Sequence, residues 1–453
     1  MNKIYESLNA AQLHAVEATE GPVMVVAGPG TGKTQILSAR IAKIIEEGRA
    51  EPNEILCLTY TEAGTVAMRK RLLQMIGTVA YKIHIHTFHS FCNKIIQENL
   101  SQFGTMNLDL ISHIEMANVL RAVIDEFEMG NPLRKSGAST YYEKDNLKQF
   151  FQEIKRERID IEKFIQSCEQ EKEISKELPE YQYKKNSGDA KKGDLNKSYF
   201  KLVEQLDKTI SAARAYPLFL AKLEAMNRYT YDDMILWVID LFERNMDMLL
   251  YYQEQFQYIL VDEYQDTNGA QSQILSLLTS HWGKDANLFV VGDDDQSIYR
   301  FQGASITNIF SFYEYYLSHL SIEEQRERVI VLTDNYRSSQ PILDASMALI
   351  ERNTERLTNA ISGIKITKDL TAKGLSKDIQ QRVYVEQFES PYHQTIGVAE
   401  KIEKLIAEGI PKNQIAVLYK NHAQSEDLQR YLTNRDIPIQ TQKNEDVFES
   451  LFI

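Results

Sequence analysis

An eight-residue glycine-rich segment, AGPGTGKT at residues 27–34, places the strongest constraint on how this chain can fold. The apolar run PVMVVA at 22–27 leads into it, as expected for a buried parallel strand, and TQILSARIAKIIEEG follows with apolar residues at helical spacing. The glycines let the backbone curl with its N–H groups inward, and the N-terminal end of the helix favours anions. A strand, loop and helix in this order predict a phosphate-binding loop, with Ala27 where the strict pattern has glycine.

Two side chains of this loop would carry chemistry. Lys33 would reach the β- and γ-phosphates of a nucleotide, and the Thr34 hydroxyl would ligate Mg²⁺. The other residues of the predicted phosphate cradle are Ala27, Gly28, Pro29, Gly30, Thr31 and Gly32. We therefore expect the chain to bind ATP and Mg²⁺.

Five further apolar runs predict the rest of a parallel sheet in an α/β fold. Their continuity indicates strands that helices cover on both faces. They lie at 54–60, 82–88, 258–262, 288–293 and 328–333. Between the second and the third of them, about 170 residues rich in Lys, Glu and Gln show no strand pattern. We interpret this stretch as an inserted helical subdomain with a flexible polar loop at 184–198.

A pair of carboxylates stands where the strand at 258–262 ends. Asp262 and Glu263 would lie at the carboxyl edge of the sheet, where parallel strands open into a crevice. Asp262 would hold Mg²⁺ through water, while Glu263 would orient the attacking water and accept its proton. Together with the phosphate loop, the pair predicts nucleotide hydrolysis.

Composition narrows the class of protein without deciding it. The 453 residues include 51 Lys and Arg against 64 Asp and Glu, a net charge of −13. No apolar run approaches the roughly 18 residues of a membrane span, and the first ten residues have no apolar signal core. We expect a cytoplasmic protein with no membrane partner. The acidic total argues against a surface that is positive throughout, but it permits a local groove for nucleic acid.

The segment LVDEYQDTNGAQ at 260–271 resembles the second motif of superfamily 1 DNA helicases of the UvrD/Rep/PcrA type. Other blocks resemble further motifs of that family in the family's order. They are LNAAQLHAV at 8–16, LTYTEAGTVAMRKRL at 58–72, HTFHSFC at 86–92, YDDMI at 231–235, VVGDDDQSIYRFQGA at 290–304 and TDNYRSSQPI at 333–342. The resemblance covers nearly the whole chain.

The resemblance implies a RecA-like P-loop NTPase sheet with a helical insertion, followed by the start of a second RecA-like lobe. The first lobe would comprise 1–100 and 217–325, with the inserted subdomain at 101–216. The second lobe would begin at 326, with strands at 384–388 and 414–419. No block resembles the family's fifth and sixth motifs. We therefore expect a chain truncated before them, with an incomplete second lobe at 326–453 and little hydrolysis of its own.

Several site residues follow from the resemblance alone. Gln12 occupies the position that reads adenine, and Tyr336 the position of the aromatic ring that stacks on it. Gln296 matches the residue that senses the γ-phosphate, and Arg337 matches a γ-phosphate arginine. The implied catalytic set is Lys33, Glu263, Gln296 and Arg337.

The family's track for single-stranded DNA also maps onto this sequence. Aromatic rings along such a track let bases stack irrespective of sequence. The matching positions are Thr59, Tyr60, Thr61, Thr87, Phe88, His89, Tyr299, Arg300 and Phe301. The chain departs from the family at Phe301, Gln302, Glu62 and Ala63, where Trp, Arg, Asn and Lys are common.

The resemblance implies the ATP-binding portion of a DNA helicase that moves 3′ to 5′ on single-stranded DNA and unwinds duplex during repair or replication. Its partners would be single-stranded and partly duplex DNA, with repair or replication proteins. Two alternatives stay open: the helicase part of a RecB/AddA-like helicase-nuclease, and a hydrolysis-deficient regulator that binds ATP and DNA.

Overall fold

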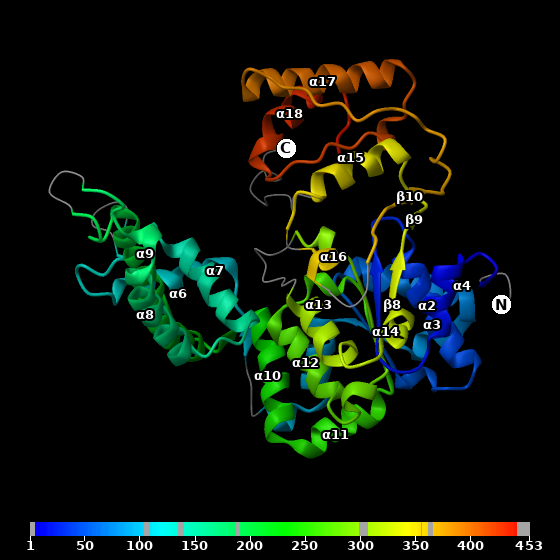
Figure 1. The fold of residues 1–453 in the computed structure, drawn as a ribbon, viewed down its shortest axis with the longest axis horizontal. Helices are drawn as coiled ribbons and strands as arrows, with labels where there is room; N and C mark the ends of the chain where they lie inside the picture. The colour runs from blue at the N-terminus through cyan, green and yellow to red at the C-terminus, as the bar shows by residue number, and fades with distance from the viewer. Residues whose placement is uncertain are drawn as a thin grey trace. The chain divides into compact units, whose positions relative to one another are not determined.

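The structure is a computed structural model that describes residues 5–103, 108–134, 140–186, 191–298, 307–354, 356–360 and 366–441. The chain divides into two compact units, residues 1–380 and residues 381–453 (Figure 1). Each unit is described by itself. Among the described residues, no helix combines the length and the apolar character needed to cross a membrane.

A six-stranded parallel sheet forms the centre of the first unit, with strand order β3-β2-β6-β7-β1-β8. The strands are β1 (Val23–Ala27), β2 (Ile55–Thr59), β3 (His84–Thr87), β6 (Tyr258–Val261), β7 (Leu288–Gly292) and β8 (Val329–Leu332). Each lies within one of the six predicted runs. Nearly all of their residues are buried, which agrees with the continuous apolar runs and confirms the predicted α/β, RecA-like class.

Helices cover both faces of this sheet. Successive residues of β1 alternate between the faces, so Met24 and Val26 pack into one core while Val23 and Val25 pack into the other. One face is covered by α5 (Phe88–Glu98), α10 (Tyr231–Arg244), α11 (Met246–Gln255), α12 (Gly269–Thr279) and α13 (Thr307–Phe312). The other is covered by α2 (Ala10–Glu17), α3 (Lys33–Glu46) and α4 (Glu62–Ile76).

Strand β8 belongs to this first sheet, as the run at 328–333 predicted, so the structure does not support a second lobe that begins at 326 with this strand. It pairs with β1 in parallel, from Met24 opposite Val329 to Ala27 opposite Leu332. Without β8, the free edge of β1 would leave backbone N–H and C=O groups unpaired. Helix α14 (Ile322–Arg328) leads into β8, and a short parallel pair, β9 (Asp334–Asn335) and β10 (Thr371–Ala372), follows it with α15 (Gln340–Ile350) and α16 (Leu357–Ala360) between them.

The inserted stretch is helical, as predicted. It contains α6 (His113–Asp125), α7 (Lys144–Arg156), α8 (Ile161–Glu177) and α9 (Lys197–Ala225), and α6, α7 and α9 share a core of their own. A parallel pair of two-residue strands, β4 (Asp109–Leu110) and β5 (Arg228–Tyr229), joins the two ends of the stretch. Helix α9 runs through the predicted boundary at 216 with Pro217 inside it, so that boundary does not coincide with the end of an element.

The second unit contains α17 (Pro391–Ala407) and α18 (Ala423–Thr433), which pack through a small core around Ala399 and Leu428. The strands predicted at 384–388 and 414–419 do not form in the structure. Val385 and Leu418 are each 95% exposed. A strand pattern forms a strand only where a neighbour supplies hydrogen-bond partners, and neither segment has one among the described residues.

Candidate nucleotide site and nucleic-acid interface

The predicted site residues converge on the carboxyl edge of the first sheet. The phosphate loop follows β1, Asp262 follows β6, Asp293 follows β7, and Asn335 comes shortly after β8. Because β6, β7, β1 and β8 are consecutive strands of the sheet, these four loops are neighbours at one edge. Segments far apart in sequence are thereby brought to one place.

The phosphate loop adopts a curled backbone that requires two of its glycines. Gly30 and Gly32 have φ angles of +70° and +91°, which side-chain-bearing residues rarely adopt. Thr31 Oγ donates to the carbonyl of Gly28 at 2.8 Å and closes the loop on itself. Gly32 is the N-cap of α3, so Lys33 and Thr34 stand in the first turn of that helix.

Lys33 and Glu263 form the central ion pair of the site. The Lys33 Nζ lies 2.5 Å from Glu263 Oε2, with the lysine side chain 10% exposed and the glutamate 34%. Glu263 has a left-handed backbone, with φ +50°, which turns the chain sharply after β6. The predicted base and the predicted phosphate-binding lysine therefore occupy one point at the edge of the sheet.

Three carboxylates follow β6, and we call residues 262–266 the first acidic turn. Burial raises the pKa of Asp262 to about 6, with a further rise from the Glu263 carboxylate and an opposing effect of Lys33. Burial likewise raises the pKa of Asp266 to about 7, and Asp266 Oδ1 is buried without a hydrogen-bond partner among the described residues. In the part of the chain that the structure describes, Lys33 is the cation that contacts this turn, which therefore holds more carboxylates than cations.

A second acidic turn, residues 293–296, follows the neighbouring strand β7. The buried Gln265 connects the two turns: its Nε2 donates to Glu263 Oε2 at 2.9 Å, and its Oε1 accepts from the Asp293 N–H at 3.0 Å. Gln296 Nε2 donates to Asp293 Oδ2 at 2.8 Å. The predicted γ-phosphate sensor is thus linked to the predicted base through two residues, Asp293 and Gln265.

The residues predicted to hold adenine gather at one corner of the phosphate loop. Gln12 Nε2 donates to the Thr31 carbonyl at 2.8 Å, and its side-chain oxygen accepts from the Asn9 N–H at 3.0 Å. Asn9 Nδ2 in turn donates to the Tyr336 hydroxyl at 3.0 Å. Gln12 and Tyr336 are therefore linked through Asn9, although 324 residues separate them.

Arg337 lies against the phosphate loop. A Cβ added to Gly30 would meet Arg337 Cβ at 2.7 Å, and the Tyr336 N–H donates to the Gly30 carbonyl at 2.9 Å. Asn335 Nδ2 donates to the Pro29 carbonyl, and Asn335 Oδ1 accepts from the Arg337 N–H at 2.9 Å. Glycine at position 30 thus permits this close approach as well as the turn.

The donor set fits a magnesium nucleotide. Hard cations such as Mg²⁺ prefer oxygen ligands, which the Thr34 hydroxyl in the first turn of α3 and the Asp262 carboxylate after β6 supply. The unpartnered oxygen of Asp266 shows that the first acidic turn can take further positive charge. The glycine-rich loop supplies backbone N–H groups for phosphate.

Part of the predicted DNA track lies at the other end of the same edge. Thr59 and Thr87 end the neighbouring strands β2 and β3 and stand opposite each other. Thr59 Oγ lies 2.7 Å from Thr65 Oγ, and Thr87 Oγ donates to Glu62 Oε1 at 3.0 Å. Thr61 caps α4 and is exposed, and Tyr60 is half-buried.

Two residues predicted to contact DNA are buried or largely covered in the structure. Phe88 is 3% exposed and packs in the core beneath the sheet, so its ring is not available for stacking on a base. His89 is largely covered, and burial lowers its pKa. Position 88 follows the strand end directly, but as the first residue of α5 it faces inward. Tyr299, Arg300 and Phe301 lie outside the described residues.

Comparison with known protein families decides the classification. The family model of the UvrD/REP helicase N-terminal domain matches residues 8–316, and that of the UvrD-like helicase C-terminal domain matches residues 330–451. This chain belongs to the UvrD/REP helicase family.

Curated relatives of this UvrD/REP chain agree with the family models. It is 33% identical over 440 residues to the ATP-dependent DNA helicase PcrA of Staphylococcus epidermidis. The aligned residues make up 97% of this chain and 51% of that protein. It is 31% identical over 445 residues to the protein of the same name from Staphylococcus aureus, with the same coverage. The chain spans about half the length of these relatives.

The expected truncation before the fifth and sixth motifs is contradicted, because the family model of the C-terminal domain matches residues 330–451. The expectation of little hydrolysis depended on the truncation and is withdrawn with it.

Sequence reasoning also missed two cations of this UvrD/REP site. Lys368 Nζ donates to Asp293 Oδ1 at 2.7 Å, to Asp295 Oδ2 at 2.8 Å and to Asp294 Oδ1. Arg356 donates to both Asp295 oxygens, at 2.8 and 2.7 Å. The three consecutive aspartates were the available signal, since buried carboxylates need cations nearby.

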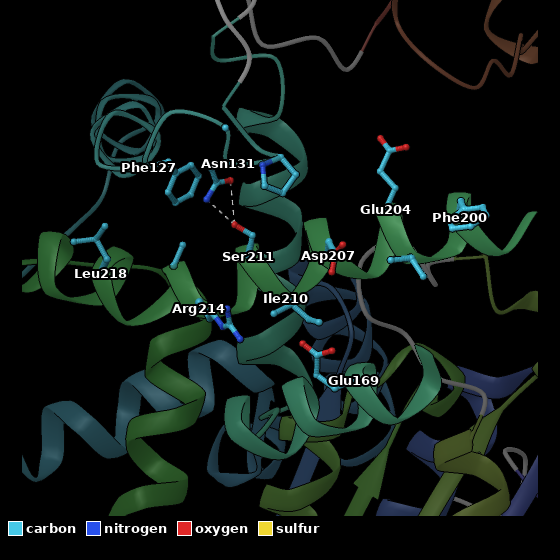
Figure 2. Close-up of a pocket in the computed structure, with 14 residues that line it drawn as sticks. Phe127, Asn131, Glu169, Phe200, Glu204, Asp207, Ile210, Ser211, Arg214 and Leu218 are labelled. Carbon is cyan, nitrogen blue, oxygen red and sulfur yellow. Dashed lines mark hydrogen bonds between the residues drawn. The ribbon is translucent and has the colours of Figure 1, made fainter. Parts of the chain in front are cut away.

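A separate cavity of about 830 Å³ lies in the inserted subdomain, lined by α8, α9 and the loop after α6 (Figure 2). Asn131 and Ser211 exchange hydrogen bonds of 2.9 and 3.1 Å at its wall. Three acidic residues, Glu169, Glu204 and Asp207, line it against one basic residue, Arg214. Such a lining disfavours a polyanion, so the cavity does not belong to the predicted DNA track.

Proposed function

We propose that this chain is the ATP-hydrolysing motor part of a DNA helicase that moves 3′ to 5′ along single-stranded DNA in repair or replication. The observation that carries the proposal is the 2.5 Å pair of Lys33 and Glu263. It joins the phosphate loop to the acidic turn that follows β6. The PcrA relatives are named ATP-dependent DNA helicases, which supports the same reaction for this chain.

The ion pair suggests how nucleotide binding would start the chemistry. The triphosphate of ATP competes for the Lys33 ammonium, and Glu263 is then free to accept a hydrogen bond from water. That water attacks the γ-phosphorus, Glu263 takes the proton, and the bond from the γ-phosphorus to the bridging oxygen of ADP breaks. A bound Mg²⁺, held by Thr34 and Asp262, would neutralise charge on the phosphate oxygens.

Further residues would complete the nucleotide site. Gln12 and Tyr336 would hold the adenine, since both are linked to Asn9 at one corner of the phosphate loop. Arg337 would contact the γ-phosphate and stabilise charge in the transition state, because its neighbours already touch the loop at Gly30. Gln296 would report the state of the phosphate to the DNA side.

The DNA would follow the β2–β3 end of the edge. Thr61 offers an exposed hydroxyl group there, and Tyr60 offers an aromatic ring for a base. Thr59 and Thr87 are only 1% and 7% exposed, so they would shape this end of the edge without contacting DNA themselves. Tyr299, Arg300 and Phe301 are the remaining proposed contacts. Strands β6 and β7 lie between this end of the edge and the phosphate loop after β1, and the turns that follow them carry Glu263 and Gln296.

The decisive test is ATPase activity with and without single-stranded DNA in the parent chain and in Lys33→Ala. We expect hydrolysis that DNA stimulates in the parent, and loss of both binding and hydrolysis of ATP in the variant. Lys43→Ala, on the same helix with its ammonium beside Glu47 and over the Tyr5 ring, is the matched control and should retain activity. A parent chain without ATPase activity would refute the proposal.

Polarity is tested separately by unwinding of a duplex with a single-stranded tail. A 3′ tail should support unwinding and a 5′ tail should not. Equal unwinding of both substrates would contradict the proposed direction while leaving the ATPase proposal intact.

A further inference from the structure

Lys368 is the most thoroughly buried cation that the site residues contact. Its side chain is 6% exposed, and it contacts Asp293, Asp294 and Asp295, whose side chains are 2%, 0% and 15% exposed. It comes from a segment 75 residues beyond Asp293 in the sequence. Arg356 binds only Asp295, so Lys368 is the cation that neutralises Asp293 and Asp294 among the described residues.

The carboxylate of Asp293 stands between Lys368 and Gln296. Its Oδ1 accepts from Lys368 Nζ at 2.7 Å and from the Asp295 N–H at 3.2 Å. Its Oδ2 accepts from Gln296 Nε2 at 2.8 Å. The lysine therefore fixes the carboxylate that fixes the orientation of the Gln296 amide.

The segment that carries Lys368 also reaches the phosphate loop. Leu370 packs on Gly28 so closely that an added Cβ there would lie 2.8 Å from Leu370 Cδ2. The Thr371 N–H then donates to the Thr333 carbonyl at 2.9 Å, and the Lys373 N–H to the Asn335 carbonyl at 2.7 Å. Two residues beyond Lys368, the segment thus contacts the loop that would bind phosphate.

We infer that Lys368 is a positioning residue that holds Gln296 through Asp293, and that residues 368–371 connect this hold to the phosphate loop. The inference rests on the proposed function, because its consequence for turnover requires ATP hydrolysis. Movement of the loop against Leu370 would shift Lys368 relative to Asp293 and so reorient the Gln296 amide. Buried cores change between discrete arrangements, which suits such a relay.

Two variants probe this relay. Lys368→Met removes the cation with little change in length. Asp293→Asn keeps an oxygen for Lys368 but presents an NH₂ group to Gln296, which turns the Gln296 amide around. For both we expect the stimulation of ATPase activity by DNA to fall about 10-fold, with KM for ATP within about twofold of the parent. Lys368→Arg should restore most of the stimulation because it keeps the charge.

A double-variant cycle separates positioning from mere stabilisation. If Lys368 acts through Gln296, the stimulation in Lys368→Met combined with Gln296→Ala equals that of Gln296→Ala alone. Lys373→Met, an exposed lysine on the same segment, is the control and should leave stimulation unchanged. Additive losses in the cycle would overturn the inference.

Amide hydrogen exchange without nucleotide gives a readout that does not require turnover. Release of Asp293 should speed exchange of the Asp295 and Gln296 amides about 10-fold in Lys368→Met and in Asp293→Asn, but not in Lys373→Met. Asp293→Asn covers the case in which Lys368→Met does not fold. Unchanged exchange in a folded variant would overturn the inference, whereas a parent without ATPase activity would refute only the proposed function.

Discussion

The two acidic turns at the ends of β6 and β7 have the same number of carboxylates but opposite electrostatics. The first holds Asp262, Glu263 and Asp266 with Lys33 as the cation in contact, and the pKa values of both aspartates are raised. The second holds Asp293, Asp294 and Asp295, which Lys368 and Arg356 bind together. Among the described residues, the turn after β6 thus carries carboxylates without a cation in contact, whereas cations contact all three carboxylates of the turn after the neighbouring strand β7.

The difference indicates a division of labour. An excess of buried negative charge lowers the stability of the fold. Such an excess is typical of a functional site whose carboxylates bind a cation or accept a proton. A neutralised cluster instead fixes geometry, because each carboxylate oxygen has a defined donor. Burial raises the pKa of Asp294 despite Lys368, while for Asp295 the hydrogen bonds from Arg356 and Lys368 outweigh burial and lower the pKa.

The largest effect is expected from the first acidic turn. Glu263→Gln keeps the shape of the side chain but removes the proton acceptor, so ATP hydrolysis should fall roughly 10²- to 10⁴-fold. Nucleotide affinity, measured with a fluorescent ATP analogue, should stay within a few-fold of the parent. Glu327→Gln, at an exposed position of α14, is the control. Normal turnover in Glu263→Gln would show that Glu263 is not the proton acceptor.

Substitutions at the second acidic turn should instead change the stability of the fold. Arg356→Met removes two hydrogen bonds to Asp295 and leaves part of a buried charge uncompensated, which should lower the free energy of unfolding by about 2 kcal/mol. The first transition in urea measures this loss. Lys163→Met, in an exposed pair with Asp160, should change it by less than about 0.5 kcal/mol. Equal effects of the two variants would contradict the comparison.

Neutralising the first turn should raise stability. The folded-state pKa of Asp266 is about 7, above its ordinary value of 3.8, so the folded parent binds more protons and loses stability as pH rises from about 4 to 7. Without nucleotide or Mg²⁺, Asp266→Asn should therefore gain on the order of 1 kcal/mol at pH 8. The gain should shrink at pH 5, where the parent carboxyl is protonated when folded. Thermal unfolding at both pH values tests the sign, and a loss of stability at pH 8 would refute it.

The smallest effect concerns a single carboxylate at the DNA end of the edge. Glu62 accepts a hydrogen bond from Thr87, and its charge would repel DNA phosphates. Glu62→Gln should raise affinity for a labelled single-stranded oligonucleotide about two- to threefold at low salt and less at high salt. Glu400→Gln, exposed on α17, should have no effect. Unchanged affinity in Glu62→Gln would place the strand elsewhere.

Most of the first sheet could be predicted because its information is local. A strand buried on both faces must be apolar throughout, and all six runs therefore appear in the sequence itself. The phosphate loop and the pair Asp262 and Glu263 were equally visible, since each follows a strand end directly. Their convergence at one edge follows from the parallel arrangement.

Other features depended on which segments meet, and local patterns do not encode that. The apolar run of β8 is consistent with either lobe, and only its pairing with β1 decides between them. Phe88 follows a strand end as a DNA contact would, yet its helix turns it into the core. The runs at 384–388 and 414–419 have strand composition but no strand beside them.

The sequence by itself determined the chemistry that this chain can offer: a loop for phosphate, a lysine, and carboxylates that follow buried strands. The tertiary structure alone decided how that charge is balanced. Lys368 and Arg356 reach the second acidic turn from 75 and 61 residues away, while the first turn contacts Lys33. Charge compensation depends on burial and distance, and these exist only once the segments have packed together.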